Sequence, residues 1–192
     1  MLDRIKRILN VTFGEGVSKG SNPDDLFDIS TGYVTLEVEG YEGLNQAGLC
    51  FSQVDSRDFE EVVEEIEDLL SVSAPETGTD YDVVEDEYGY RWVVLRDPDF
   101  EDLVTTIHMS TDSLVAQGYA KQLLCAVFAF EKDDEVYWLY NFKRGKWYPF
   151  VPKEGKRERD NQHELKLRTL MSSELDIEED ETRWYPLWDV PF

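Results

Sequence analysis

The chain has 192 residues, of which 41% are hydrophobic and 13% aromatic, which is enough to build the core of one ordinary domain. This composition excludes a disordered chain, and no apolar run reaches the roughly 18 residues that a membrane-spanning helix requires. With 42 acidic and 19 basic residues the net charge is −23. Nucleic-acid binding is therefore disfavoured, because a phosphate backbone needs a basic surface.

The acidic residues are spread along the whole chain rather than gathered in one tail. In dilute buffer, self-repulsion of this size destabilises a compact state. In molar salt the Debye length falls to about 3 Å and the repulsion is screened. The charge therefore predicts a halophilic source, and the alternative is an acidic protein with a cationic partner at low salt.

The two cysteines, Cys50 and Cys125, lie inside apolar runs and form no CxxC or Cys/His cluster. We expect both to be reduced thiols of the core. Reduced thiols and an N-terminus without a long apolar signal region predict a cytoplasmic protein.

Residues 2–9 read LDRIKRIL and place apolar side chains on one face of a helix, with basic side chains beside it. This pattern predicts a short basic amphipathic helix that contacts the inner face of the membrane or docks on a partner. The alternative is a helix that folds back on the core. The Gly/Ser-rich segment that follows is expected to be a linker, which divides the chain into residues 1–22 and one domain at 23–192. The candidate docking residues are Leu2, Arg4, Ile5, Arg7 and Ile8.

In the first third of the domain, residues 31–40 alternate apolar and polar side chains and predict a strand, and residues 46–54 predict a second. A helix is expected to begin after Asp55 or Ser56, both good caps, and its row of carboxylates is expected to be a solvated face. Residues 73–80 are expected to form a loop.

The remaining elements follow the same signals. Residues 81–86 and 90–95 predict a hairpin around Gly89, and a helix is expected from Asp97-Pro98 to Gly118, with His108 as a structural residue. Strands are expected at 123–130 and 135–142, then an edge strand or an extended arm at 147–152 because of its prolines. A last helix is expected from Asp160 to about Ser173. The predicted fold is a single α+β domain, mainly an antiparallel sheet of hairpins with about three packed helices.

No catalytic or metal-ligating motif is present, so we expect no enzyme activity and no cofactor. The histidines, His108 and His163, belong to different predicted helices, and both cysteines lie in the middle of strands, where thiols are usually inert. A pair of catalytic carboxylates is an open alternative, since spacing along the chain says nothing about proximity across the fold.

Two segments stand out as candidate interaction surfaces. Residues 143–159 hold seven basic and two acidic residues, and their first part, 143–152, interleaves cations with aromatics. The terminal segment 183–192 reads RWYPLWDVPF. The alternatives are that the aromatics of the first segment belong to the core, and that the terminal segment is a tail that closes it.

Four strings of residues carry a resemblance to a known family. They are LCAVFAF at 124–130, YxFKRGxWYPFxP at 140–152, RDNxxEL at 159–165 and RWYPLWxxP at 183–191. In these strings, and over nearly its whole length, the chain resembles the PspA-associated protein family, PspAB.

The resemblance implies an accessory or adaptor protein of a phage-shock-like membrane-stress system. Its members accompany PspA, a coiled-coil protein that coats damaged membrane, and often occur near an HtpX-like membrane protease. A secretion-chaperone-like module that binds unfolded clients is the alternative, followed by a hydrolase with an unrecognised carboxylate site. The resemblance implies no catalytic residues. The motif residues that it marks as candidates for partner binding are Lys143, Arg144, Gly145, Tyr148, Pro149, Phe150, Trp184, Pro186, Leu187 and Trp188.

Overall fold

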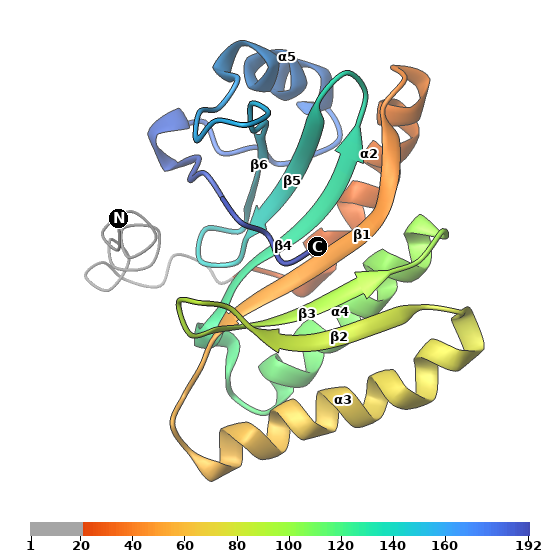
Figure 1. Ribbon diagram of the computed structural model, residues 1–192, viewed down its shortest axis with the longest axis vertical. Coiled ribbons are helices and arrows are strands. Elements are labelled where there is room, and N and C mark those ends of the chain that lie inside the picture. The colour runs from red at the N-terminus through yellow and green to blue at the C-terminus, as the bar shows by residue number, and fades with distance from the viewer. Residues whose placement is uncertain (1–20) are drawn as a thin grey trace.

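The computed structural model describes residues 21–192 (Figure 1), so the predicted basic helix at 2–9 lies outside the described residues. One antiparallel sheet holds six strands in the order β2-β3-β1-β4-β5-β6. The antiparallel pairing agrees with the prediction from the hairpin pattern. The α+β fold class is thereby confirmed. The strands are β1 (Glu42–Ser52), β2 (Asp80–Glu85), β3 (Tyr90–Arg96), β4 (Leu123–Glu131), β5 (Glu135–Asn141) and β6 (Lys146–Phe150).

Helices cover one face of the sheet, where their apolar residues and the inward side chains of the strands share one core (Figure 1). Polar side chains cap three of them, since Ser56 accepts from the Phe59 N–H, Asp99 from the Glu101 N–H and Asp160 from the His163 N–H. The helices are α2 (Asp28–Val38), preceded by the 3₁₀ turn η1 (Pro23–Phe27), then α3 (Arg57–Thr77), α4 (Phe100–Ala116) and α5 (Asn161–Met171). Two further 3₁₀ turns are η2 (Ala120–Gln122) and η3 (Glu181–Arg183).

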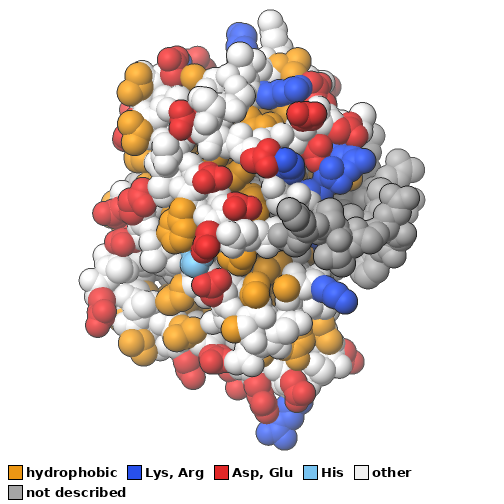
Figure 2. All heavy atoms as spheres, turned by 180° about the vertical axis from the view of Figure 1, so that it is seen from behind, with side chains coloured by type: hydrophobic (Ala, Val, Ile, Leu, Met, Phe, Trp, Pro, Cys, Tyr) orange, Lys and Arg blue, Asp and Glu red, His pale blue; other side chains and the backbone are white. Residues whose placement is uncertain are grey.

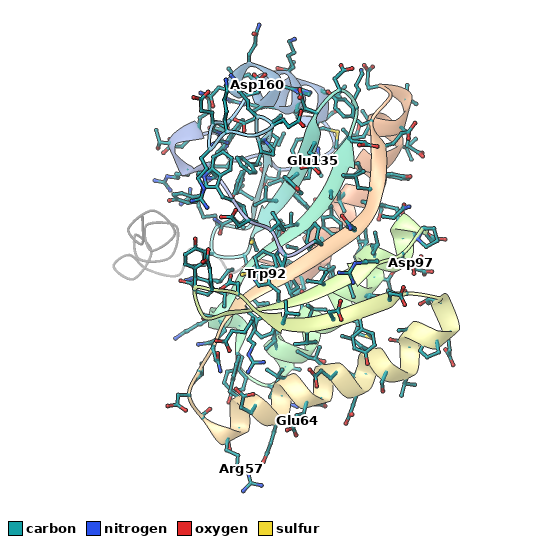
Figure 3. The ribbon with its side chains drawn as sticks, in the orientation of Figure 1. Arg57, Glu64, Trp92, Asp97, Glu135 and Asp160 are labelled. Atoms are coloured by element: carbon teal, nitrogen blue, oxygen red, sulfur yellow. The ribbon has the colours of Figure 1, made fainter. Side chains whose placement is uncertain are left out.

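The outer side of α3 carries the acidic row that the sequence predicts to be solvated. Arg57 and Glu64 point away from the sheet (Figure 3), and Glu61 is exposed while pairing with Arg57 at 2.9 Å. The helix buries Phe59 and Ile66 on its opposite side. This helix is therefore amphipathic in the manner expected of one that covers a sheet.

The other face of the sheet is covered by the C-terminal arm, residues 184–192, which crosses it as an extended segment (Figure 1). Trp92 lies on this face (Figure 3) and packs near the last residue, Phe192. A Cβ at Gly48 of β1 would lie 2.7 Å from Phe192 Cε1 and 3.2 Å from Trp92 Cε3. Glycine at position 48 therefore gives the terminal ring room to lie on the sheet.

The strand predicted at 31–40 is wrong, because these residues form helix α2 and the first turn after it. Alternating β-branched and polar residues favour a strand locally. In the structure, Ile29, Gly32 and Leu36 are buried at helical spacing, and Gly32 lets Met171 approach closely. Tertiary packing on the sheet and on α5 overrides the local preference. The structure thus packs one helix more than the sequence predicts.

The loop predicted at 73–80 is also wrong in its first half. Helix α3 continues through Pro75 to Thr77 and ends at Gly78, whose φ of 88° suits a left-handed cap. Ala74 is buried in the last turn and Pro75 is exposed there. The last turn thus keeps its packing on the sheet while the proline ring points to solvent.

Candidate functional site

The two strings that are most specific to the resemblance meet at the free edge of β6. Trp147 donates its N–H to the Asp176 carbonyl at 3.0 Å and accepts from the Glu178 N–H at 2.9 Å, forming a parallel bridge to Ile177. The indole N–H of Trp184 then donates to the Glu178 carbonyl at 2.9 Å. Residues 176–178 thus cover the edge strand and lead the chain onto the second face of the sheet.

Most of the aromatic residues that the sequence marks for partner binding are buried in the chain's own packing. Tyr148, Phe150 and Trp184 are buried, as is the backbone-rigid Pro149. Phe150 meets Trp188 edge to face, with 4.9 Å between ring centroids. The arm therefore closes the core, which is the alternative to partner binding that the sequence left open for this segment.

The remaining marked residues are partly exposed. Pro186, Leu187 and Trp188 lie half-buried on the arm, and Leu187 and Trp188 pack on the sheet's second face. Gly145 occupies the turn before β6 with a φ of 63°, which a side chain would strain. Contact of these residues with a partner stays a prediction.

The basic window 143–159 is largely neutralised by acids that follow it in the chain. Arg144 pairs with Glu178, Lys146 with Asp176 at 2.6 Å, and Arg157 with Asp189. A fourth cation, Arg159, pairs with Glu164 at 2.8 Å. Burial lowers the pKa of the Lys143 ammonium. The positive patch that the sequence suggests as a contact surface is thus mainly an internal tie to the C-terminal segment.

Arg159 and Glu164 form the most buried of these pairs, which we call the Arg159 clamp. Arg159 Nε donates to both carboxylate oxygens of Glu164, at 2.9 and 2.8 Å, and one guanidinium nitrogen donates to the Trp184 carbonyl. Its guanidinium lies 5.6 Å from the centroid of the Phe150 ring. The Val151 N–H also donates to Glu164, at 2.9 Å.

The clamp ties together three segments of the structure. Glu164 is 2% exposed, and burial raises the pKa of its carboxyl while Arg159 and the Val151 N–H act to lower it. The charge is tolerated inside the protein because two donors face it. The clamp therefore holds β6, α5 and the arm together, which is a structural task.

A second surface, which the sequence analysis missed, lies on the outer side of η1 and α2. Phe27, Val34 and Val38 are 39%, 59% and 80% exposed and follow one another at positions i, i+7 and i+11. With Thr31 between them they form one row along the helix, which we call the α2 stripe. The sequence contains apolar residues at helical spacing on both sides of this helix. Interpreting residues 31–40 as a strand hid this pattern.

A shallow hollow adjoins α2 at the start of α4. Its volume is about 430 Å³, and it is lined by Tyr33, Pro98, Asp99, Phe100 and Glu101. The Tyr33 and Phe100 rings stack in parallel, with 4.3 Å between centroids. Figure 2 shows hydrophobic side chains set among acidic ones on this helical side of the molecule. This surface combines apolar, aromatic and anionic groups.

The titratable residues that the sequence analysis considered have structural partners. His108 lies 3.1 Å from Asp24, and its ring is tilted against the Phe27 ring with 4.6 Å between centroids. His163 Nε2 lies 2.8 Å from the Tyr41 hydroxyl. Within residues 21–192, no group of three or more His, Cys, Asp or Glu side chains is placed to hold a metal ion. In the same range no helix is long and apolar enough to cross a membrane.

Cys50 and Cys125 face each other across β1 and β4. Both thiols are free; Cys50 is buried and Cys125 is partly exposed. Burial raises the pKa of the Cys50 thiol, and a hydrogen bond with Cys125 adds to this. The expectation of reduced thiols is consistent with this arrangement, and Cys50 is the less reactive of the two.

Comparison with known protein families places the chain in one of them. No curated protein and no solved structure matches the chain. The family described as PspAB, PspA associated protein B, matches residues 6–192, which is nearly the entire sequence. The matched range includes β6, the Arg159 clamp and the arm, so the strings that carry the resemblance fall inside it. The chain therefore belongs to the PspA associated protein B family.

Proposed function

We propose that this protein is a non-catalytic accessory protein of a phage-shock-like membrane-stress response, and that it acts by binding a PspA-like coiled-coil protein. The observation that carries the proposal is the family match over residues 6–192, since the family is described by its association with PspA. An HtpX-like membrane protease is the second partner class. The proposed site of action is the cytoplasm of a halophilic cell, at the inner face of the membrane.

The chemistry of the described surface supports binding rather than catalysis. The carboxylates in the hollow already have structural partners, because Asp99 caps α4 by accepting from the Glu101 N–H at 3.0 Å and Glu101 accepts from the Ser30 hydroxyl at 2.9 Å. The most buried carboxylate, Glu164, is held by Arg159.

The charge of the protein supports a partner that presents basic side chains. Apart from the windows 1–20 and 143–159, which carry +2 and +5, the chain carries −30. Within the second window, four of the seven basic side chains form ion pairs with acids of this chain, which neutralises much of the positive charge. In molar salt, the attraction between acidic side chains of this protein and basic side chains of a partner acts only at close contact, because the salt screens it at larger separations.

An affinity purification of the tagged full-length protein from its own cells, in molar KCl, tests the proposal by mass spectrometry of the co-eluting proteins. We expect a PspA-like coiled-coil protein to be enriched over a tagged control protein of similar net charge. If only a membrane protease is enriched, the protease and not a PspA-like protein would be the partner. Recovery of no protein above the control would overturn the proposed function.

A further inference from the structure

The outer side of η1 and α2 carries three of the large apolar side chains that are exposed among the described residues, and these three lie in one row. The stripe runs from Phe27 to Val38, which at 1.5 Å per residue is about 16 Å. The opposite side of the same helix buries Ile29 and Leu36 in the core. A helix that is apolar on two sides is normally covered on both.

The exposure of this row is more than the scatter expected of a soluble surface. Single exposed apolar residues are common and need no explanation. Here three large ones follow one helical line, and the last of them, Val38, is 80% exposed. The stacked rings of Tyr33 and Phe100 continue the apolar surface into the neighbouring hollow. Apolar patches with a polar rim mark interaction sites.

The rim of this surface is mainly acidic, with one cation, Lys132, which donates to the Glu39 carbonyl next to Val38. Neither Pro23–Val38 nor Phe100–Ala116, the two segments that build it, contains a lysine or arginine. The exposed acids that surround the stripe and the hollow are Asp24, Asp28, Glu37, Asp99 and Glu101. A second copy of this chain would bring acid against acid, and a phosphate or anionic lipid surface would be repelled for the same reason.

The spacing of the apolar anchors fits a helix. Phe27 and Val34 are seven residues apart, and a coiled-coil heptad repeats its apolar seam at the same interval. Two helices pack 8–10 Å apart through such rows, and an amphipathic helix lying on an apolar surface is a recurrent mode of recognition. Positive charge beside the seam of that helix would meet the acidic rim.

We propose that the α2 stripe docks a basic amphipathic helix of the partner protein. Its apolar row lies on Phe27, Val34 and Val38. A lysine or arginine beside that row enters the hollow, where the Tyr33 and Phe100 rings and the Asp99 and Glu101 carboxylates receive the cation. This inference rests on the proposed function, in which the partner is a PspA-like coiled coil.

The test compares the full-length wild type with the double variant V34E/V38E, which places two carboxylates on the stripe. The matched control is V72E, since Val72 is 70% exposed on α3, away from the stripe. Because all three sites are exposed, circular dichroism and thermal melting are expected to match the wild type. Two probes are titrated by calorimetry, the purified PspA-like protein and a synthetic peptide of about 21 residues with leucine at heptad positions a and d and lysine elsewhere.

We expect V34E/V38E to bind both probes at least about tenfold more weakly than the wild type, because carboxylates on the stripe would lose their hydration against an apolar row. V72E is expected to bind like the wild type. The variant D99N/E101Q keeps a helix cap at position 99, and we expect it to weaken binding and to reduce its salt dependence.

The outcomes separate this inference from the function on which it rests. If the PspA-like protein binds the wild type and V34E/V38E equally, the docking surface is refuted and the proposed function stands. If only the peptide binds, and V34E/V38E abolishes that binding, the docking surface stands and the function falls. Absence of binding to both probes refutes both. A wild type whose size depends on concentration, and a monomeric V34E/V38E, would assign the stripe to self-association and refute the docking of a basic helix.

Discussion

Replacing Arg159 by alanine tests how the C-terminal segment is held. The substitution leaves Glu164, which is 2% exposed, facing only the Val151 N–H, and it also removes the donor to the Trp184 carbonyl. Removing one partner of a buried ion pair costs about 3–5 kcal/mol, because the remaining charge is uncompensated. A domain of this kind is stable by about 5–15 kcal/mol, so R159A is expected to remove a large share of its stability.

The matched variant E164Q changes the same pair from the other side. Glutamine keeps an oxygen that accepts from Val151, and the Arg159 side chain, 20% exposed, still reaches solvent. We therefore expect E164Q to cost about 1–2 kcal/mol, near the value of a charged hydrogen bond. The double variant R159A/E164Q should cost less than the sum of the single changes, since no buried charge is left behind.

Urea unfolding at one fixed KCl concentration, followed by tryptophan fluorescence, measures all four proteins. Urea is preferred because it leaves the ionic strength unchanged, whereas guanidinium chloride would screen the pair. A loss below about 1 kcal/mol for R159A would refute the proposed clamp. Strict additivity of the two single variants would refute the coupling between them.

Four further results are expected. G32A should cost about 1–2 kcal/mol in urea unfolding, because a Cβ at Gly32 would overlap Met171 Cε. In G32A/M171A the overlap is relieved, but this gain should be smaller than the cost of the cavity that the missing Met171 side chain leaves. Burial raises the pKa of Tyr137 to about 12, so its contribution to stability is full below about pH 10 and is lost as the pH rises towards 12. An alkaline titration of wild type and Y137F, read by phenolate absorbance, should show one late-ionising tyrosine fewer in the variant. Iodoacetamide should modify the partly exposed Cys125 before the buried Cys50, as measured by mass spectrometry of the folded protein; equal rates would contradict the burial of Cys50. The thermal midpoint should rise between about 0.1 M and about 2 M KCl, because screening relieves the self-repulsion of a net charge of −23; a flat profile would contradict salt adaptation.

Local signals in the sequence were sufficient for most elements of the fold. Ser56 and Asp160 cap helices α3 and α5 where their chemistry predicts it. The hairpins β2–β3 and β4–β5 follow from apolar runs separated by turn residues. Pro149 correctly marked β6 as an edge strand, because proline cannot donate a ladder hydrogen bond.

Helix α2 shows where local signals fail. Over residues 31–38 the same apolar residues satisfy both a period of two and a helical period, and their β-branched members favour a strand. The decision is made by contacts that the sequence does not display, such as the approach of Met171 to Gly32 across 139 positions of the chain. The α2 stripe was missed for this reason, because the residues that face solvent can be predicted only once it is known whether a segment is a strand or a helix.

The region around β6 shows the same limit for a candidate site. The interleaved cations and aromatics of 143–152 resemble a binding surface in sequence. In the structure, Trp147 and Phe150 are fully buried, and Arg144 is neutralised by Glu178, 34 positions later. Pairing of this kind depends on the path of residues 172–192 across the sheet, which no local pattern encodes.

Sedimentation velocity of the purified full-length protein mixed with a purified PspA-like coiled-coil protein, in molar KCl, tests the central claim most directly. We expect one faster-sedimenting species that contains both proteins, with a Kd near or below about 1 μM. We also expect that species to be lost with V34E/V38E and retained with V72E. Independent sedimentation of the two wild-type proteins at concentrations well above that value would contradict the assignment of this chain as a PspA-binding accessory protein.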